Sequence, residues 1–278
     1  MTSIENRRES FAKLHETGCF VIPNPWDIGS ARLLAQLGFP ALATTSAGFQ
    51  FTRGLSDTVW GSSCESVLAH VSEMVGATDL PVSADFQSAY AHDAKGVYTN
   101  VARCLDTGVA GLSIEDATGN PAEPLYNLPR SVARIKAARE AIDANGARVL
   151  LTARAESYLV GHPEPLNDVL RRLTAYADAG ADVLFAPGAK TPEELEAIVQ
   201  AVAPKPVNAI VTGNLGLRVD DIAALGVRRI SVGSALARAA WGAFIRAARA
   251  IADGGSFEGL DGAASFAELN DAFSRQRE

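Results

Sequence analysis

The sequence has little of what a disulfide-bonded or zinc-stabilised protein needs. Its 278 residues include three cysteines, Cys19, Cys64 and Cys104. Their spacing matches no metal-binding motif, and an odd number of cysteines argues against a disulfide framework. A hydrophobic core must therefore stabilise the fold. With 47% hydrophobic residues, a chain of this length can form a large one.

Basic residues and long apolar runs are also scarce. Lysine and arginine number 25 against 32 acidic residues, and the net charge is −7. A surface that follows nucleic-acid phosphates has an excess of basic residues, so we expect no nucleic-acid partner. No apolar run approaches the roughly 20 residues of a membrane span. The polar residues 1–16 predict an amphipathic helix rather than a signal peptide. We therefore expect a cytoplasmic protein with no membrane partner.

Hydrophobic residues occur in eight short runs that alternate with helical stretches. Four runs lack a glycine lead and cover residues 19–24, 80–85, 148–154 and 205–210. The other four follow helical segments that end in a glycine, the residue suited to the left-handed position after a helix: Gly38, Gly108, Gly180 and Gly226. Apolar strands that alternate with helices predict a parallel sheet covered on both faces, and eight units predict a (β/α)8 TIM barrel. A doubly wound dinucleotide-binding sheet is disfavoured because no GxGxxG follows a strand.

We expect residues 1–278 to form a single barrel domain with a helical C-terminal tail. After Ala235 the sequence predicts one long apolar helix that contains Trp241 and Phe244. This helix is too apolar to face only water, so we expect it to pack on another subunit.

Polar residues end several predicted strands, where the active site of a barrel lies. Asp85 and Glu115 are hard oxygen ligands that suit Mg²⁺, with Mn²⁺ as an alternative ion. Mg²⁺ takes only one or two carboxylates directly and keeps several waters, so we expect the neutral Gln87 to hydrogen-bond a metal-bound water. Arg154 offers a planar fork for a substrate carboxylate or phosphate. The small residues 45–48 leave backbone N–H groups free to hold an anion.

These residue types predict a small acidic substrate chelated to a divalent metal, where polarisation of a 2-oxo group would stabilise an enolate. Structural interpretations stay open beside this one. Asp85 can be a helix N-cap, Glu115 can belong to a turn, and Arg154 can simply neutralise one of them. Of the four histidines, two are assigned to polar loops and two to exposed helix faces: His92 and His162, and His15 and His70.

The chain resembles the isocitrate lyase/phosphoenolpyruvate mutase family from about residue 8 to about residue 245. The resemblance rests on the ordered segments FVIPNPWD, ATTSAGFQFTRGLSD, PVSADFQSAY, GLSIED, LLTARAESY and PVNAI. It implies a Mg²⁺-dependent (β/α)8 barrel, usually a homotetramer in which the eighth helix is swapped between subunits.

The resemblance also implies a role for each matching residue. In the metal shell it places Asp85 as direct ligand, together with Gln87, Glu115 and Asp57. For the substrate it implies Thr45, Ser46 and Ala47 at the carboxylate, Asn208 as a pocket-lining residue, and Arg154 as the binding arginine. Arg154 and Glu115 are the residues that we expect to be catalytic.

The chain departs from the family pattern in three places. Gln87 stands where the family usually has Asp or Glu, which predicts weaker Mg²⁺ binding. The loop at residues 116–129 has no Cys, Lys or His, so the usual gating-loop residues of the lyases and of the phosphonate mutases are missing. Glu123 and Tyr126 are its only side chains with obvious proton-transfer potential. The sequence Ala-Pro-Gly at 186–188 replaces a glutamate of the lyases.

The expected function is that of a Mg²⁺-dependent lyase acting on a small 2-oxo or 2-hydroxy acid through a metal-stabilised enolate. Oxaloacetate-type decarboxylation is the least demanding reaction, because it needs an electron sink first and a proton only afterwards. Cleavage of a C–C bond in a 2-hydroxy diacid would need a base that the sequence does not identify. Two alternatives stay open, namely phosphoenolpyruvate or carboxyphosphonoenolpyruvate mutase chemistry, and a barrel that binds oxo acids without turnover.

Overall fold

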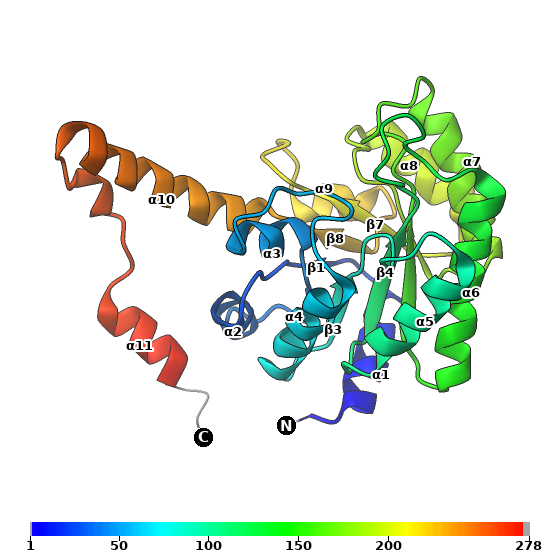
Figure 1. Cartoon of the computed structure of the whole chain (residues 1–278), viewed down its shortest axis with the longest axis horizontal. Coiled ribbons are helices and arrows are strands. Elements are labelled where there is room, and N and C mark those ends of the chain that lie inside the picture. Colours follow the sequence, from blue (N-terminus) through cyan, green and yellow to red (C-terminus); the bar gives the residue numbers. More distant parts are fainter. Residues whose placement is uncertain (1, 275–278) are drawn as a thin grey trace.

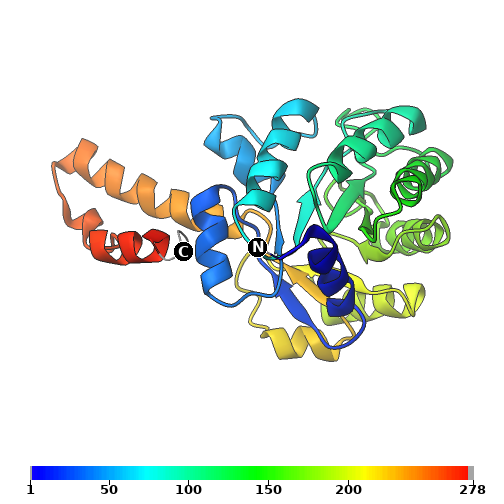
Figure 2. The same cartoon turned by 90° about the horizontal axis from the view of Figure 1, so that it is seen from below.

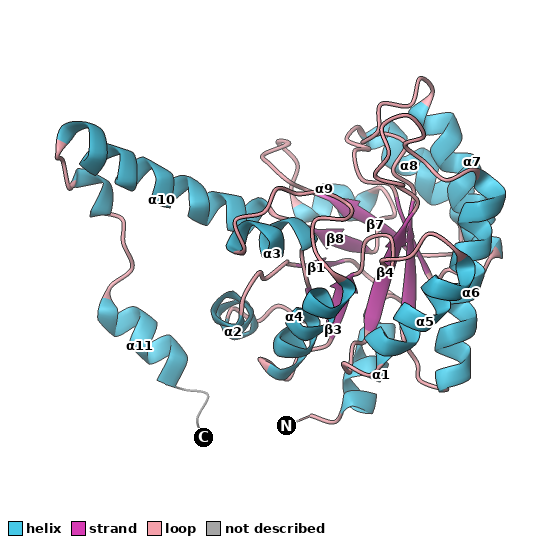
Figure 3. Cartoon of the chain, viewed as in Figure 1, coloured by secondary structure: helices cyan, strands magenta, loops and turns pink. Residues whose placement is uncertain are grey.

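Eight short parallel strands form the centre of the molecule (Figure 3). The structure is a computed structural model that describes residues 2–274. The strands are β1 (Phe20–Ile22), β2 (Leu42–Ala43), β3 (Val82–Asp85), β4 (Gly111–Glu115), β5 (Leu150–Arg154), β6 (Val183–Phe185), β7 (Val207–Ile210) and β8 (Arg229–Ser231). Their order is β1-β8-β7-β6-β5-β4-β3-β2, with a seam between β1 and β2. The Ala43 N–H donates to the Pro23 carbonyl at 3.0 Å across this seam, so the sheet is a nearly closed barrel.

Helices surround the barrel, as Figure 2 shows from below. The helices of the described chain are α1 (Ile4–Leu14), α2 (Ile28–Gln36), α3 (Ser46–Thr52), α4 (Cys64–Gly76), α5 (Ala94–Leu105), α6 (Leu128–Asn145), α7 (Pro165–Asp178), α8 (Pro192–Val202), α9 (Val219–Ala224), α10 (Ala235–Gly254) and α11 (Phe266–Ser274), with a 3₁₀ turn η1 (Glu258–Leu260). All but α10, α11 and η1 lie around the barrel. The amphipathic helix predicted within residues 1–16 is α1. The (β/α)8 barrel predicted from the sequence is therefore confirmed.

Alternation along the strands separates an apolar layer from a polar interior. On β4, Leu112 and Ile114 are buried in the hydrophobic core that lies between the strands and the helices. Ser113, between them, faces the inside of the barrel, because side chains alternate along a strand. At the amino-terminal end of the barrel, Phe11 of α1 packs edge-on against Phe20 and is fully buried. Apolar side chains therefore close the barrel interior at its amino-terminal end, and polar side chains line it at its carboxyl-terminal end.

Glycine ends the helices that precede four of the strands, as predicted. Gly38, Gly108, Gly180 and Gly226 have φ of 84°, 86°, 101° and 90°, which side chains with a Cβ rarely adopt. A Cβ at Gly180 would also lie 2.8 Å from the Cγ of Arg139. Glycine is needed there both for its backbone angle and for its size.

The C-terminal helix α10 extends away from the barrel (orange in Figure 1), and α11 lies beyond it near α2. Its apolar side chains are largely uncovered, with Phe244 61% and Trp241 37% exposed. Among the described residues, no helix has the length and apolarity to cross a bilayer. The uncovered apolar face is what the sequence predicted, and its packing on another subunit stays a prediction.

Candidate active site

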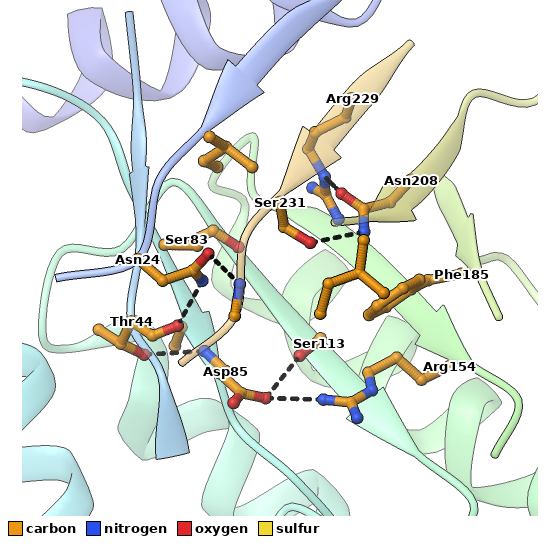
Figure 4. A pocket seen from close by; sticks show the side chains of 15 residues that line it. Asn24, Thr44, Ser83, Asp85, Ser113, Arg154, Phe185, Asn208, Arg229 and Ser231 are labelled. Carbon is orange, nitrogen blue, oxygen red and sulfur yellow. Dashed lines mark hydrogen bonds and ion pairs between the residues drawn. The ribbon is translucent and has the colours of Figure 1, made fainter. Parts of the chain in front are cut away.

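The inward-facing side chains at the carboxyl ends of the strands enclose a cavity of about 60 Å³ (Figure 4). Most of its polar lining comes from single residues at or near strand ends: Asn24, Asp85, Ser113, Arg154, Asn208 and Ser231. Asp85 is the one carboxylate among the described residues that line it, and none of them is His, Cys, Lys or Tyr. The cavity can thus bind polar groups but contains no obvious neutral base.

Asp85 is the last residue of β3, and its carboxylate accepts hydrogen bonds from four donors. Its Oδ2 accepts from the backbone N–H and the hydroxyl of Ser46 at 2.9 and 2.8 Å. Its Oδ1 accepts from Arg154 Nη1 at 3.0 Å and from Ser113 Oγ at 3.5 Å. The helix that follows β3 is capped by Asp93 instead, so the interpretation of Asp85 as a helix cap is wrong. The carboxylate is fixed in position by contacts within the site.

The predicted carboxylate-binding segment lies at the start of α3. Thr45 is the N-cap, and its side chain accepts from the Gly48 N–H at 3.2 Å. The Ser46 N–H is taken by Asp85, so it is not free for a substrate in this arrangement. Ala47 stands at the second helical position, where a backbone N–H has no acceptor within its own helix.

Arg154, at the end of β5, is the cation around which the acidic residues gather. Its Nη1 lies 3.0 Å from Asp85 Oδ1 and 3.3 Å from Glu115 Oε2. Its Nε and Nη2 lie 2.9 and 2.8 Å from Glu156 Oε1. The guanidinium also stacks over the ring of Phe185, 5.2 Å from its centroid. Three carboxyl groups share this one arginine as their cationic partner.

The electrostatics of the cluster follow from its burial. Desolvation raises the pKa of Glu115, and the neighbouring acids Glu156, Asp85 and Asp116 add to this effect. Desolvation also raises the pKa of Glu156. Burial opposes the charge of Arg154, yet the three carboxylates raise its pKa. The arginine therefore stays charged, and the acids around it would be stabilised by a further cation.

Gln87 lies beside the cavity and does not line it. Its side chain is buried, with Oε1 accepting from the Tyr90 hydroxyl at 2.9 Å and Nε2 donating to the Thr58 carbonyl at 3.4 Å. Its backbone is left-handed, with φ of 44°. A carboxylate could accept from Tyr90 but could not donate to Thr58, which explains a neutral amide at this position. Its contact with a metal-bound water stays a prediction.

Asp57 lies on the exposed loop between α3 and α4. Partial loss of hydration raises the pKa of this carboxyl group, and the charge of Asp85 raises it further. The charge of Asp85 thus affects Asp57, although Asp57 is not among the described residues that line the cavity.

The loop that follows β4 is fastened at both ends. Asp116 accepts from the Glu156 N–H, from Arg172 Nη1 and from the Tyr176 hydroxyl at 2.9, 3.1 and 2.6 Å, which ties the strand end to α7. Tyr126 is buried, and its hydroxyl lies 2.6 Å from His92 Nδ1. Tyr126 therefore anchors the loop in this conformation rather than facing the cavity.

Several residues of the site were not among the candidates predicted from the sequence. They are Asn24, Ser113, Glu156, Arg229 and Ser231. A signal for Ser113 existed, because it stands two residues before Glu115 and so shares the inward face of β4. The assignment of two histidines to exposed helix faces was wrong. His15 and His70 are 8% and 5% exposed, because α1 and α4 turn these faces toward the barrel.

The residues present fit a hydrated divalent cation better than a metal held in a closed protein cage. Among the described residues, no three His, Cys, Asp or Glu side chains are already arranged to hold a metal ion. Mg²⁺ needs only one or two direct carboxylates, and Asp85 supplies one at the cavity wall.

Comparison with known proteins identifies the relatives of this chain. Residues 11–252 match the family described as phosphoenolpyruvate phosphomutase. An oxaloacetate decarboxylase of Rhodopseudomonas palustris is 31% identical over 273 residues, which cover 95% of this chain and 91% of that protein. An uncharacterized protein of Mycobacterium tuberculosis is 33% identical over 261 residues, 94% of each chain. A solved structure from Burkholderia cenocepacia J2315, provisionally described as a lyase/mutase, has a TM-score of 0.93 and 44% identity and covers 98% of this chain and 97% of its own.

Proposed function

Because this chain belongs to the isocitrate lyase/phosphoenolpyruvate mutase superfamily of lyases and mutases, we propose that it is a Mg²⁺-dependent lyase of a small 2-oxo or 2-hydroxy acid. Oxaloacetate-type decarboxylation is the reaction that we place first. The observation that supports it is the pairing of Asp85 with Arg154 in a small polar cavity without a neutral base. Full-length similarity to oxaloacetate decarboxylases at 31% identity points the same way.

Decarboxylation suits these residues because it does not begin with the removal of a proton by a base. Breaking the bond between C3 and C4 of oxaloacetate releases CO₂ and leaves its electron pair as an enolate, which afterwards takes a proton at C3. No base has to remove a proton first. Cleavage of a 2-hydroxy diacid starts with such a removal, and the described residues that line the cavity include no His, Lys, Cys or Tyr for it.

The chain's own residues would bind and orient the substrate. Three acids secure the charge of Arg154 and take most of its N–H bonds, so it would attract a substrate carboxylate by its charge and donate to it from Nη2. Asn208 and the Ala47 N–H would donate to further oxygens. Glu115 and Glu156 would hold the guanidinium in place, so a displacement of either acid should disturb the orientation of the substrate.

A divalent cation fits at Asp85, with Glu115 and Asp57 farther from it. When bound, such a cation supplies Lewis-acid polarisation of the 2-oxo group. We place Mg²⁺ first and Mn²⁺ second, because both prefer oxygen ligands. Gln87 would contribute through a water, since both ends of its amide are already bonded.

Phosphorus–carbon bond chemistry is the second candidate, and one finding favours it. The matched family is described as phosphoenolpyruvate phosphomutase. Against it, the loop at 116–129 lacks the residues expected for a mutase.

Turnover of a panel of acids tests the proposal. Oxaloacetate, methylisocitrate and phosphonopyruvate would each be incubated with the enzyme and Mg²⁺, and in parallel with EDTA. Reactions without enzyme are essential, because metal ions alone decarboxylate oxaloacetate. EDTA-sensitive release of CO₂ and pyruvate from oxaloacetate is the expected result. Turnover of phosphonopyruvate alone would establish the mutase function instead, and no turnover of any compound would contradict both.

We also propose a homotetramer in which α10 packs on a neighbouring subunit. The uncovered side chains of Trp241 and Phe244 support this proposal, because an apolar face on an extended helix is costly in water.

A further inference from the structure

Arg229 is a buried cation that pairs with no acid among residues 2–274. It lies at the start of β8, lines the cavity and is 5% exposed. In the described part of the chain no carboxylate pairs with it, and desolvation alone lowers its pKa to about 9. Arg154, in the same barrel, has three acidic partners. Burying a charge without a counter-ion costs free energy of folding. A functional role for Arg229 would explain why the chain bears that cost.

The hydrogen bonds of Arg229 all go to neutral groups. Its Nε donates to Asn208 Oδ1 at 2.7 Å and its Nη2 to Thr152 Oγ1 at 3.0 Å. Its Nη1 lies 3.4 Å from His15 Nε2. His15 is neutral, because burial lowers its pKa to about 3, and its Nδ1 lies 2.8 Å from the Phe11 carbonyl. Nδ1 therefore holds the proton, and Nε2 is an acceptor for Arg229.

These contacts determine which way the Asn208 amide faces. The two ends of an asparagine amide have nearly the same shape, so a neighbour must distinguish them. A guanidinium can only donate, and it therefore holds the Asn208 oxygen on its own side. The amide nitrogen then donates to Ser231 Oγ at 3.0 Å, and that hydroxyl in turn reaches the Ala209 carbonyl at 3.4 Å. Figure 4 shows the amide nitrogen of Asn208 bonded to Ser231. Asn208 lines the cavity, and its second N–H bond has no partner among the described residues.

We propose that Arg229 is a positioning residue that orients the Asn208 amide, so that an N–H donor backed by a positive charge faces the cavity and binds a carboxylate oxygen of the substrate. The inference rests on the proposed function for its substrate class. It assigns specificity for anions to the wall formed by β7 and β8, opposite the acidic cluster at Asp85. Arg154 has much of its charge offset by acids, whereas the charge of Arg229 is not offset.

Oxalate is a suitable probe, because it is a small dicarboxylate that cannot lose CO₂ by this route. Its dissociation constant in the presence of Mg²⁺ would be measured by calorimetry for wild type and for Arg229→Met. Methionine is unbranched and uncharged, and we expect oxalate binding to weaken about tenfold or more, the usual effect of losing a charge-supported hydrogen bond. The KM for the substrate should rise more than kcat falls, because the contact binds the substrate throughout the reaction.

The neighbouring Arg228→Met is a matched control. It removes the same charge from the adjacent residue, whose guanidinium donates to the Gly18 carbonyl and does not line the cavity. We expect its oxalate affinity to stay within about twofold of wild type. If Arg229→Met binds oxalate as Arg228→Met does, the inference is overturned.

Asn208→Asp keeps the inference testable if Arg229→Met fails to fold. Aspartate would form an ion pair with Arg229, so the thermal midpoint should not fall, yet it would present an oxygen to the cavity in place of an N–H. We expect oxalate binding to be lost, and retained affinity would overturn the inference. Arg229→Lys keeps the charge and should bind oxalate more tightly than Arg229→Met.

The outcomes separate this inference from the proposed function. Oxalate binding that depends on Arg229 in a protein that turns over no compound of the panel would support the inference and contradict the function. Turnover, together with an oxalate affinity that is the same in wild type and in Arg229→Met, would support the function and contradict the inference. A wild-type protein that does not bind oxalate would also overturn the inference, because it asserts an anion site.

Discussion

Replacement of Asp85 by Asn should separate the chemistry of the site from the stability of the fold. The Oδ2 of Asp85 faces two donors, both from Ser46, so the amide oxygen of asparagine should take that place. The amide nitrogen would then face Arg154 Nη1, now 3.0 Å from Oδ1, and two donors would oppose each other. The substitution therefore removes a charged hydrogen bond and the one carboxylate among the described residues that line the cavity.

The expected loss of stability is modest. A hydrogen bond to a charged group contributes about 1.5–3 kcal/mol. Arg154 keeps Glu115 and Glu156 as partners, so its charge is not left alone. Removing Asp85 also relieves repulsion, since its charge raises the pKa of Asp57 and of Glu115. We expect the free energy of unfolding to fall by no more than about 2 kcal/mol, at the low end of the range.

The expected loss of activity is large. Removal of residues that merely support a metal ligand costs about 10- to 100-fold, and a direct ligand should cost at least about 100-fold. The assay is metal-dependent kcat/KM with oxaloacetate, corrected for the reaction without enzyme, together with urea unfolding of both proteins. Asp79→Asn is the control, because Asp79 pairs with Arg7 at 3.2 Å outside the cavity. A variant at position 85 that retains full metal-dependent activity would refute the site.

Three further predictions test other parts of the molecule. Burial, with the charge of Arg53, lowers the pKa of His70 from 6.5 to about 4. The unfolded chain therefore binds a proton below pH 6.5 that the folded chain does not. The contribution of His70 to the free energy of unfolding should therefore fall by about 2 kcal/mol between pH 7 and pH 5. His70→Leu should remove this part of the pH dependence in urea unfolding, whereas His162→Leu should not. Gln87→Glu should lower the free energy of unfolding by about 1–3 kcal/mol, because the buried carboxylate would face the Thr58 carbonyl; an unchanged urea midpoint would contradict the role of this amide. Phe244→Glu should reduce the molar mass measured by light scattering, whereas Leu37→Glu, also exposed and apolar but outside α10, should not.

The barrel was predictable because its pattern is local and repeated. Each strand is a short apolar run, and Gly38, Gly108, Gly180 and Gly226 mark the ends of helices by a requirement of the backbone alone. Eight repeats of one strand–helix unit leave few alternative folds. The positions of Asp85 and Arg154 followed from the same rule, since strand ends converge in a barrel.

The ion pairs within the candidate site were harder to predict from the sequence. Glu156 follows Arg154 by two residues, and nothing local indicates that it holds the guanidinium from one side while Asp85 and Glu115 hold it from another. Likewise, the sequence places His15 and His70 on helices but does not say which face each helix turns inward. Such facts depend on the tilt and stagger of strands far apart in the chain.

The sequence by itself determined the barrel, the edge of it that holds the site, and the kinds of side chain available there, because periodicity and backbone requirements act over a few residues. Only the tertiary structure decided which donors meet which acceptors. Within the described chain it gave Arg154 three acids and Arg229 none, although both are arginines on strands of the same barrel. The reason is physical. Hydrogen bonds and ion pairs act over about 3 Å, a distance that the folded chain alone sets between residues that lie tens of positions apart.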